Sequence, residues 1–570
     1  MIKKKEQFEI LRSQLSTERA TFLPTWREAA DFILPRRPRF LVSDTNRGDR
    51  RSTKIIDSTA TQAVSTLQSG MMAGLSSPAR PWFRLTTPDQ GMADYGPVKE
   101  WLYKVSSIME TSMARGNLYN VLPMTYSDIG VFATGAFGVE EDFADVSRFT
   151  SFPIGSYMIG NDERGRVNTF FREFRMTVRQ LIQKFGVKDA TGKPDWSKFS
   201  TEVRNHWERG NKETWINVCH VIQPNPDFDE TKIDAKFKKF TSCYYERGGE
   251  KDGTYNGSDN FLRESGYDYF PVLAPRWQTT GEDSYGTTCP GLVCLGDIKQ
   301  LQIGERRIMQ AIEKMVNPPM VGPPEMKTLK ASILPGDITY IRELDGQKGF
   351  RPAHLVEPRV NELEMKQAQV RNRIEKAFYV DMFQMFANSD RREMTAAEVA
   401  ERHEEKLFAL GPMLEQQNQD LFNPLIDLQF DFLLRQGQIP PPPQEIQGVK
   451  LKVEFVSIMA QAQKLAGVSN IERFTSFVGN LVTTTQDPTI VDKVDFDQLI
   501  DIYGDLTSVP PGIIRTDEAV AQIKQNRAQA QQEAQQQQAE AQQAQNAKNL
   551  AGASLEGDNA LKRVIEPKVA

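Results

Sequence analysis

The sequence predicts an α+β protein in which helices predominate. Two helical segments, at 285–316 and 359–380, flank a proline-bounded insert, and residues 517–550 form an almost unbroken Ala/Gln helix pattern. Residues 214–280 have strand-like runs between Gly- and Asp-rich turns. A chain of 570 residues is too long for one hydrophobic core, so we expect several subdomains.

The region before residue 214 is predicted to combine helices with polar loops. A helix from Glu6 to Leu34 should bend at Pro24, because proline removes one hydrogen bond of the helix. Further helices are predicted at 56–75, 98–114 and 118–131, and Thr177 is the expected N-cap of another. Strands are expected at 155–174, before this cap.

The loop at 36–54 is strongly basic. Its cations are Arg36, Arg37, Arg39, Arg47, Arg50, Arg51 and Lys54. Such a cluster can bind phosphate, but a solvated loop or a contact between subunits is the favoured interpretation.

The two helical segments around the insert carry the clearest pattern. Apolar residues of the first recur three or four apart, at Leu292, Leu295, Ile298, Leu301, Ile308, Ile312 and Met315. A helix of this length is roughly 40 Å long. The second helix has a thinner stripe that the polar Gln367 interrupts. Two interpretations stay open: rods that pack against other copies in a ring, and a helical hairpin inside a monomeric core.

The C-terminal third is predicted to be mainly helical. Residues 381–393 interrupt the periodicity and are predicted to be a loop, after which Thr395 caps a long helix with kinks at Pro412 and Pro424. Residues 451–456 are a strand candidate. The Ala/Gln helix has no apolar stripe, so it is either part of a bundle of copies or a solvated helix.

Composition and motifs argue against several classes of protein. The net charge of −5 does not fit a simple nucleic-acid binder, and no stretch has the length and apolarity of a membrane span. There is no phosphate-binding loop of an ATPase, and four scattered histidines and four cysteines form no metal motif. The cysteines are expected to be free thiols, and the lack of a signal sequence indicates a cytoplasmic protein.

Several runs, in their order and spacing, resemble one known family. They are IDSTA at 56–60, LQSGMMAGLSSP at 67–78, WFRL at 82–85, ATGAFGVEE at 133–141, DERGRV at 162–167, FREFRMT at 171–177, the segment 285–319 and MTAAEV at 394–399. Together they resemble the head-to-tail connector (portal) proteins of short-tailed bacteriophages over most of residues 1–435. Beyond residue 437 only the general layout is similar.

The resemblance implies the portal fold of wing, stem, clip and crown, assembled as a ring. The implied parts are 1–284 as a wing with a helical and a β-rich part, 285–316 and 359–380 as stem helices, 317–358 as the clip, 381–394 as a tunnel loop, 395–436 as a long kinked wing helix, 437–515 as the crown, 516–550 as an Ala/Gln-rich helix of the crown or barrel, and 551–570 as a disordered tail.

The resemblance also implies a function that is not enzymatic. Twelve copies would form a channel at one capsid vertex, through which double-stranded DNA is packaged and ejected without sequence specificity. Implied partners are the terminase packaging ATPase, the major capsid and scaffolding proteins, and tail or adaptor proteins, with no cofactor, metal or membrane. The expected location is the virion, and the host cytoplasm during assembly. A structural capsid or tail protein without a DNA channel is the alternative.

Site residues follow from the same assignment. Expected DNA contacts in the tunnel loop are Gln384, Asn388, Ser389, Arg391 and Arg392. Charges expected along the stem channel are Lys299, Arg306, Arg307, Lys314, Glu362 and Arg373. Clip residues expected to contact the terminase or an adaptor are Lys327, Lys330, Asp337, Arg342 and Glu343. A lining of mixed charge suits a conduit, since each phosphate neutralised by a cation would hold the DNA in place.

Overall fold

The structure is a computed structural model. It describes residues 4–42, 48–93, 95–186, 196–248, 261–316, 318, 320–321, 351–352, 360–388, 411–449, 451–455, 458–485, 493–507 and 517–551. The chain divides into two compact units. The first comprises Met1–Pro88, Lys104–Pro442 and Gly448–Ala466; the second comprises Asp89–Tyr103, Pro443–Gln447 and Gly467–Ala570.

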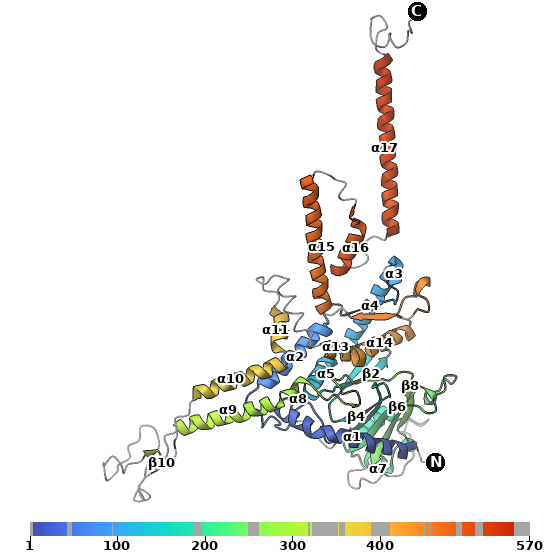
Figure 1. Cartoon of the computed structure of the whole chain (residues 1–570). Helices are drawn as coiled ribbons and strands as arrows, with labels where there is room; N and C mark the ends of the chain where they lie inside the picture. The colour runs from blue at the N-terminus through green and yellow to red at the C-terminus, as the bar shows by residue number, and fades with distance from the viewer. Residues whose placement is uncertain are drawn as a thin grey trace, which may run out of the picture. The chain divides into compact units, whose positions relative to one another are not determined.

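The first unit contains a five-stranded antiparallel sheet, which lies toward the end that holds the N-terminus (Figure 1). Its strands follow chain order: β4 (Tyr157–Asn161), β5 (Val167–Thr177), β6 (Trp215–Pro224), β7 (Phe240–Gly248) and β8 (Arg263–Tyr267). Side chains alternate between its faces, as strand geometry requires. Helix α1 (Lys4–Phe32) covers one face, where Phe8 packs against Phe171 and Tyr245.

The other face of this sheet packs against α6 (Val178–Phe185) and α7 (Thr201–Glu208). Its core includes Leu181, Val203 and Val218. Thr177 caps α6 as predicted: its hydroxyl accepts from Gln180 N, and the Gln180 side chain accepts from Thr177 N, which makes a capping box.

A second, smaller sheet and several helices complete the first unit. The sheet has the order β3 (Val146–Phe152), β2 (Ala136–Asp142) and β9 (Val272–Leu273). Helix α5 (Leu118–Phe132) is buried along most of its length and packs on α2 (Thr59–Leu75). Strand β1 (Phe83–Thr86) pairs with β12 (Lys452–Phe455), far away in the sequence. The mixture of helix and sheet confirms the α+β class.

The region predicted as one kinked helix at 395–436 is described from residue 411 and has three parts. They are α13 (Gly411–Gln417), a π-helical turn (Asn418–Phe422) and α14 (Asn423–Arg435). Pro424 lies in the first turn of α14, where its missing N–H costs little. The π turn carries Asp420, which accepts two 2.9 Å hydrogen bonds from the buried Arg276. This bidentate pair fixes α13 and α14 to the sheets.

The second unit is helical. It contains α3 (Gln90–Ala93) and most of α15 (Ile458–Thr485), together with α16 (Phe496–Thr507) and α17 (Asp517–Ala551). Helix α4 (Gly96–Arg115) begins in this unit and ends in the first. Tyr503 of α16 donates a 3.0 Å hydrogen bond to Glu472 of α15. Among the described residues, no helix is apolar over a length sufficient to cross a bilayer.

Candidate functional site

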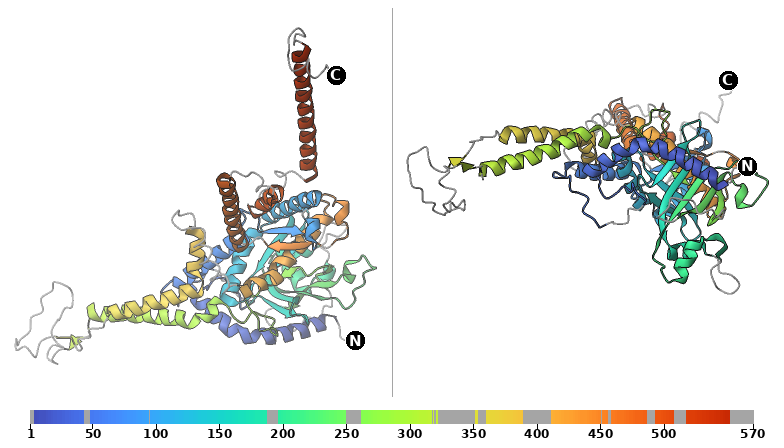
Figure 2. Two further views of the ribbon diagram at one scale, coloured as in Figure 1. Left: turned by 45° about the horizontal axis from the view of Figure 1, so that its top comes forward. Right: turned by 90° about the horizontal axis from the view of Figure 1, so that it is seen from below.

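Two antiparallel helices in the first unit, α9 (Leu295–Val316) and α10 (Val360–Ala377), form the hairpin that the sequence singled out. The two helices lie side by side in all views of Figures 1 and 2. A short turn of helix, α8 (Pro290–Val293), precedes α9. The two ends of the insert meet in antiparallel strands β10 (Met320–Val321) and β11 (Arg351–Pro352).

The first helix starts later than predicted. Residues 285–289 are not helical, because they are bound to other parts of the unit. The buried Tyr285 hydroxyl accepts a 3.1 Å hydrogen bond from Ile159 N, and Gly286 N donates a 2.8 Å hydrogen bond to the Thr134 hydroxyl. A helix here would break both contacts. Pro290 is the first helical residue, and the helix is interrupted once, at Cys294.

The root of the hairpin is apolar and buried. Ile298, Leu301 and Ile308 of α9, and Val370 and Ile374 of α10, are at most 7% exposed. Helix α2 packs against α10 here. The apolar stripes of both helices are therefore satisfied within one chain near α2.

A buried glutamine locks α9 to the start of α2. Gln302 Oε1 accepts hydrogen bonds from Ile56 N at 2.6 Å and Asp57 N at 2.9 Å. Its Nε2 donates to Asp57 O at 2.9 Å. Each of these backbone groups precedes α2, so they have no partner within that helix.

An ion-pair network joins α2, α9 and α10. Arg371 Nε donates to Asp57 Oδ2 at 2.9 Å, and its Nη2 donates to Glu305 Oε1 at 2.6 Å. Burial opposes ionisation of Asp57, but hydrogen bonds from Thr59 and the contact with Arg371 outweigh it and lower the pKa of this carboxyl. The root is thus held by charge as well as by apolar contact.

Gln367, which interrupts the apolar stripe of α10, is buried against α9. Gln367 is 6% exposed and lies against Gly304 of α9, where an added Cβ would lie 1.6 Å from its Nε2. The absence of a side chain at Gly304 makes room for the amide. Gln367 Oε1 has no hydrogen-bond partner among the described residues.

The outer part of the hairpin differs from its root. Met309, Ile312 and Val316 recur three and four apart on one face of α9 and are 62%, 42% and 81% exposed. Met315 of α9 and Met365 of α10 are exposed as well. These side chains form an exposed apolar face along the outer part of the hairpin.

The predicted stem charges occupy different settings. Lys299 pairs with Glu28 of α1, and Arg373 pairs with Asp297 at 2.9 Å. Arg306, Arg307 and Lys314 are exposed on α9, and Glu362 is exposed on α10. Cations and anions therefore alternate along the hairpin, as the sequence suggested, but two of the cations contribute to the fold.

The prediction of a loop at 381–393 is wrong for residues 381–388. Residues Val380–Asn388 form helix α11, which contains the exposed Gln384 and ends at Asn388. The sequence shows no helical stripe here. Val380, Met382 and Phe383 are the buried side chains among those described in α11, and Phe383 packs on Gly70 of α2. Ser389, Arg391 and Arg392 lie outside the described residues.

The remaining predictions concern the clip and metal sites. Lys327, Lys330, Asp337, Arg342 and Glu343 all lie outside the described residues. Among the residues that are described, no group of three or more His, Cys, Asp or Glu side chains could hold a metal ion. The four cysteines are buried, and burial raises the pKa of the Cys289 and Cys294 thiols to about 12, so these two stay protonated.

Comparisons with known proteins converge on one family. The family model described as "Bacteriophage head to tail connecting protein" matches residues 5–514. A portal protein of Salmonella phage epsilon15 is 44% identical over 552 residues, which covers 97% of this chain and 96% of that protein. A probable portal protein of Bordetella phage BPP-1 is 41% identical over 552 residues, with the same coverage of both chains.

Proposed function

Since the chain belongs to the bacteriophage head to tail connecting protein family, we propose that its copies assemble into a ring around a channel for double-stranded DNA. Like its portal relatives, the chain is a structural protein of the virion, and it is not an enzyme. In the proposed ring of twelve, the channel stands at one capsid vertex and serves DNA packaging and ejection.

The observation that carries the proposal is the exposed apolar face of Met309, Ile312 and Val316 on α9. One chain offers this face no cover within the described residues, whereas a neighbouring copy rotated about a common axis would. Rings arise when a surface of one copy meets a different surface of the next and the rotation closes.

The charge pattern supports a conduit. A duplex carries one phosphate per ~1.7 Å of axis, so a passage of roughly 40 Å faces about twenty or more phosphates. A row of unpaired cations would hold these phosphates. Pairing Lys299 with Glu28 and Arg373 with Asp297 leaves a mixed lining, and each copy has a net charge of −5.

We assign the parts of the ring as the family layout suggests. Helices α9 and α10 form the stem, and residues 317–358 form the clip that meets the terminase and later tail or adaptor proteins. Residues 381–394 approach the DNA, with Gln384, Asn388, Ser389, Arg391 and Arg392 as its contacts. Capsid and scaffolding proteins contact the wing, which includes residues 1–284, and assembly takes place in the host cytoplasm.

Negative-stain imaging of the purified chain tests this proposal. We expect rings with a central hole wide enough for a duplex, and no nucleotide hydrolysis. A capsid or tail protein without a DNA channel is the competing function, and closed assemblies without a hole would favour it. A protein that stays monomeric at every concentration would overturn the ring.

A further inference from the structure

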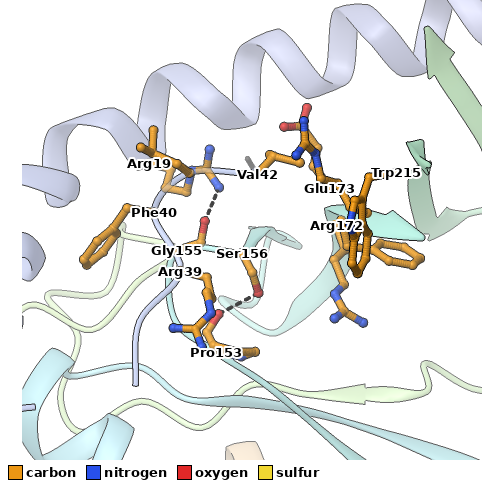
Figure 3. Close-up of a pocket in the computed structure, with 13 residues that line it drawn as sticks. Arg19, Arg39, Phe40, Val42, Pro153, Gly155, Ser156, Arg172, Glu173 and Trp215 are labelled. Atoms are coloured by element: carbon orange, nitrogen blue, oxygen red, sulfur yellow. Dashed lines mark hydrogen bonds between the residues drawn. The ribbon is translucent and has the colours of Figure 1, made fainter. Parts of the chain in front are cut away.

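A cavity of about 480 Å³ lies in the first unit (Figure 3), and no residue of the α9–α10 hairpin lines it. Its walls come from α1, from residues 39–42, from the turn at 153–156, from the second half of β5 and from Trp215 at the start of β6. This volume lies within the range of small-molecule sites, roughly 300–1,000 Å³.

The backbone shapes this cavity in two ways. Pairing between β4 and β5 ends at Tyr157 and Arg172, so the remainder of that edge of β5 borders the cavity. Arg39 N donates a 3.0 Å hydrogen bond to Ile154 O, which fixes the start of the basic loop. Gly155 has φ +85°, and a Cβ there would lie 2.7 Å from the Phe40 ring, so glycine is required for this approach.

The lining is cationic: it contains four arginines, Arg19, Arg39, Arg172 and Arg175, against one carboxylate. That carboxylate, Glu173, accepts hydrogen bonds from Arg12 at 3.2 Å and from Arg247 at 3.0 Å. Neither of these two arginines lines the cavity. Of the lining arginines, Arg175 donates from Nε to Asn217 Oδ1 at 3.0 Å. Arg39 donates from Nη1 to the carbonyl oxygens of Arg36 and Pro38 at 3.1 and 2.9 Å, and the acceptors in all three of these contacts are neutral.

Arg19 reaches the cavity wall from α1. Its Nη1 donates to Gly155 O at 2.8 Å and to Tyr157 O at 3.3 Å, as Figure 3 shows for the first contact. Both acceptors are neutral carbonyl oxygens, so the charge of the guanidinium remains. Its Nε is buried and has no partner among the described residues.

Arg172 is a second cation without a carboxylate partner in the described part of the chain. Its guanidinium lies 4.7 Å from the centre of the Phe152 ring and 4.6 Å from that of Phe174. Burial lowers the pKa of Arg172 to about 10, and its Nε also has no hydrogen-bond partner there. A buried cation of this kind adds to a positive potential that attracts anions.

We propose that this cavity binds the phosphate of a nucleotide or of a nucleic-acid strand. Several guanidinium groups from different elements suit the oxygens of phosphate, and Arg is the preferred side chain for such recognition. Trp215, which is 43% exposed and lines the cavity, offers a surface on which a base can stack. The proposal does not depend on assembly into a ring. It agrees with one interpretation of the basic loop at 36–54, namely that the loop binds phosphate, because Arg39 of that loop lines the cavity.

Calorimetric titration of the purified full-length protein tests the site. The ligands are pyrophosphate, deoxyadenosine monophosphate, a 5′-phosphorylated oligothymidylate and a short glutamate peptide. We expect phosphate ligands to bind, with affinity weakened about tenfold or more in the double variant Arg39→Gln/Arg175→Gln. Arg164→Gln is the matched control, because it removes an exposed arginine in the β4–β5 turn outside the cavity.

The variants and ligands separate the outcomes. Arg39→Lys/Arg175→Lys keeps both charges, so it should retain part of the affinity, and thermal melting checks that each variant folds. Oligonucleotide binding tighter than that of the mononucleotide assigns the site to a strand, whereas the reverse order assigns it to a free nucleotide. The proposal fails if no phosphate ligand binds, if the double variant binds as the control does, or if the glutamate peptide binds more tightly.

Discussion

Gly70 of α2 determines how closely helix α11 can approach. A Cβ at this position would lie 2.1 Å from Cγ of Phe383 and 2.6 Å from its Cβ, in a contact that the buried ring cannot easily vacate. We expect Gly70→Ala to destabilise the protein by about 1–3 kcal/mol, although alanine favours a helix, because overpacking displaces α11. Thermal unfolding of the purified protein measures this loss.

Gly74 provides the matched control one turn later in the same helix. No atom lies within 4 Å of a Cβ added there, so Gly74→Ala should be neutral or stabilising by up to about 1 kcal/mol. Equal effects of the two substitutions would show that contact with Phe383 does not set the position of α11.

Glu110 of α4 gives the fold a dependence on pH. Burial raises the pKa of its carboxyl from 4.5 to about 7, against the opposing effects of a backbone hydrogen bond at Trp82 and of Arg84. The folded state therefore holds a proton that the unfolded state has released between these two values. The unfolding free energy falls as pH rises through this window and stays low above it.

We expect Glu110→Gln to stabilise the protein at pH values above about 7 and to have little effect below about 4.5. The gain should be about 1–2 kcal/mol, less than full linkage predicts, because the carboxyl is partly exposed and solvent screens it. Unfolding midpoints at both ends of the window measure it, with the exposed Glu100→Gln as control. A constant difference at all pH values would contradict the role of ionisation.

Among the helices, the contact between α9 and α2 depends on one side chain. Gln302→Leu would leave the N–H groups of Ile56 and Asp57 without their side-chain acceptor at a part-buried place. We expect a loss of about 1–3 kcal/mol, because an unsatisfied buried group costs about that much and water can reach part of this site. Gln300→Leu, at an exposed position of the same helix, should cost little.

Hydrogen exchange locates the effect of Gln302→Leu. The amides of Ile56 and Asp57 should exchange faster in this variant than in Gln300→Leu, because their acceptor is lost. A global loss of stability without this local change would mean that Gln302 acts through packing alone.

Periodicity predicted those elements whose stability depends on one buried face. The stripe of Ile298, Leu301 and Ile308 was sufficient to place α9, and the Thr177 cap was sufficient to place the start of α6. Helix α11 was missed because its anchor is a contact with Gly70, more than three hundred residues earlier. The contact between Gln302 and the start of α2 joins residues far apart in the sequence. No local sequence pattern marks such a contact, so it could not be predicted from the sequence alone.

The same limit applies to the π turn. Pro412 and Pro424 indicated an irregular helix, but the reason for the turn lies in Arg276, which holds Asp420 from a distant segment. The cavity was indicated only in part. Phosphate binding was the less favoured interpretation of the basic loop, and Arg19 and Arg172 join the cavity through the packing of α1 on the sheet.

For the whole molecule, the outer half of the hairpin decides between a monomer and a ring. Its root is covered by α2, but Met309, Ile312 and Val316 present an apolar face that is 42% to 81% exposed within the described part of a single copy. Burial in an interface stabilises the assembly by about 25 cal/mol for each Å² of apolar surface removed from water. A buried carboxylate at such a place is costly, because it has neither a partner nor water.

We therefore expect the double variant Met309→Asp/Ile312→Asp to fold and to lose the ring. Its thermal unfolding as a monomer should resemble that of monomeric wild-type chain, since both side chains are exposed within one copy. Light scattering after size-exclusion chromatography measures the mass of the assembly. Gln310→Asp adds a carboxylate at an exposed polar position of the same helix and should leave the assembly unchanged. If the double variant still forms rings, the outer part of α9 is not the surface between copies, and another face must close the ring.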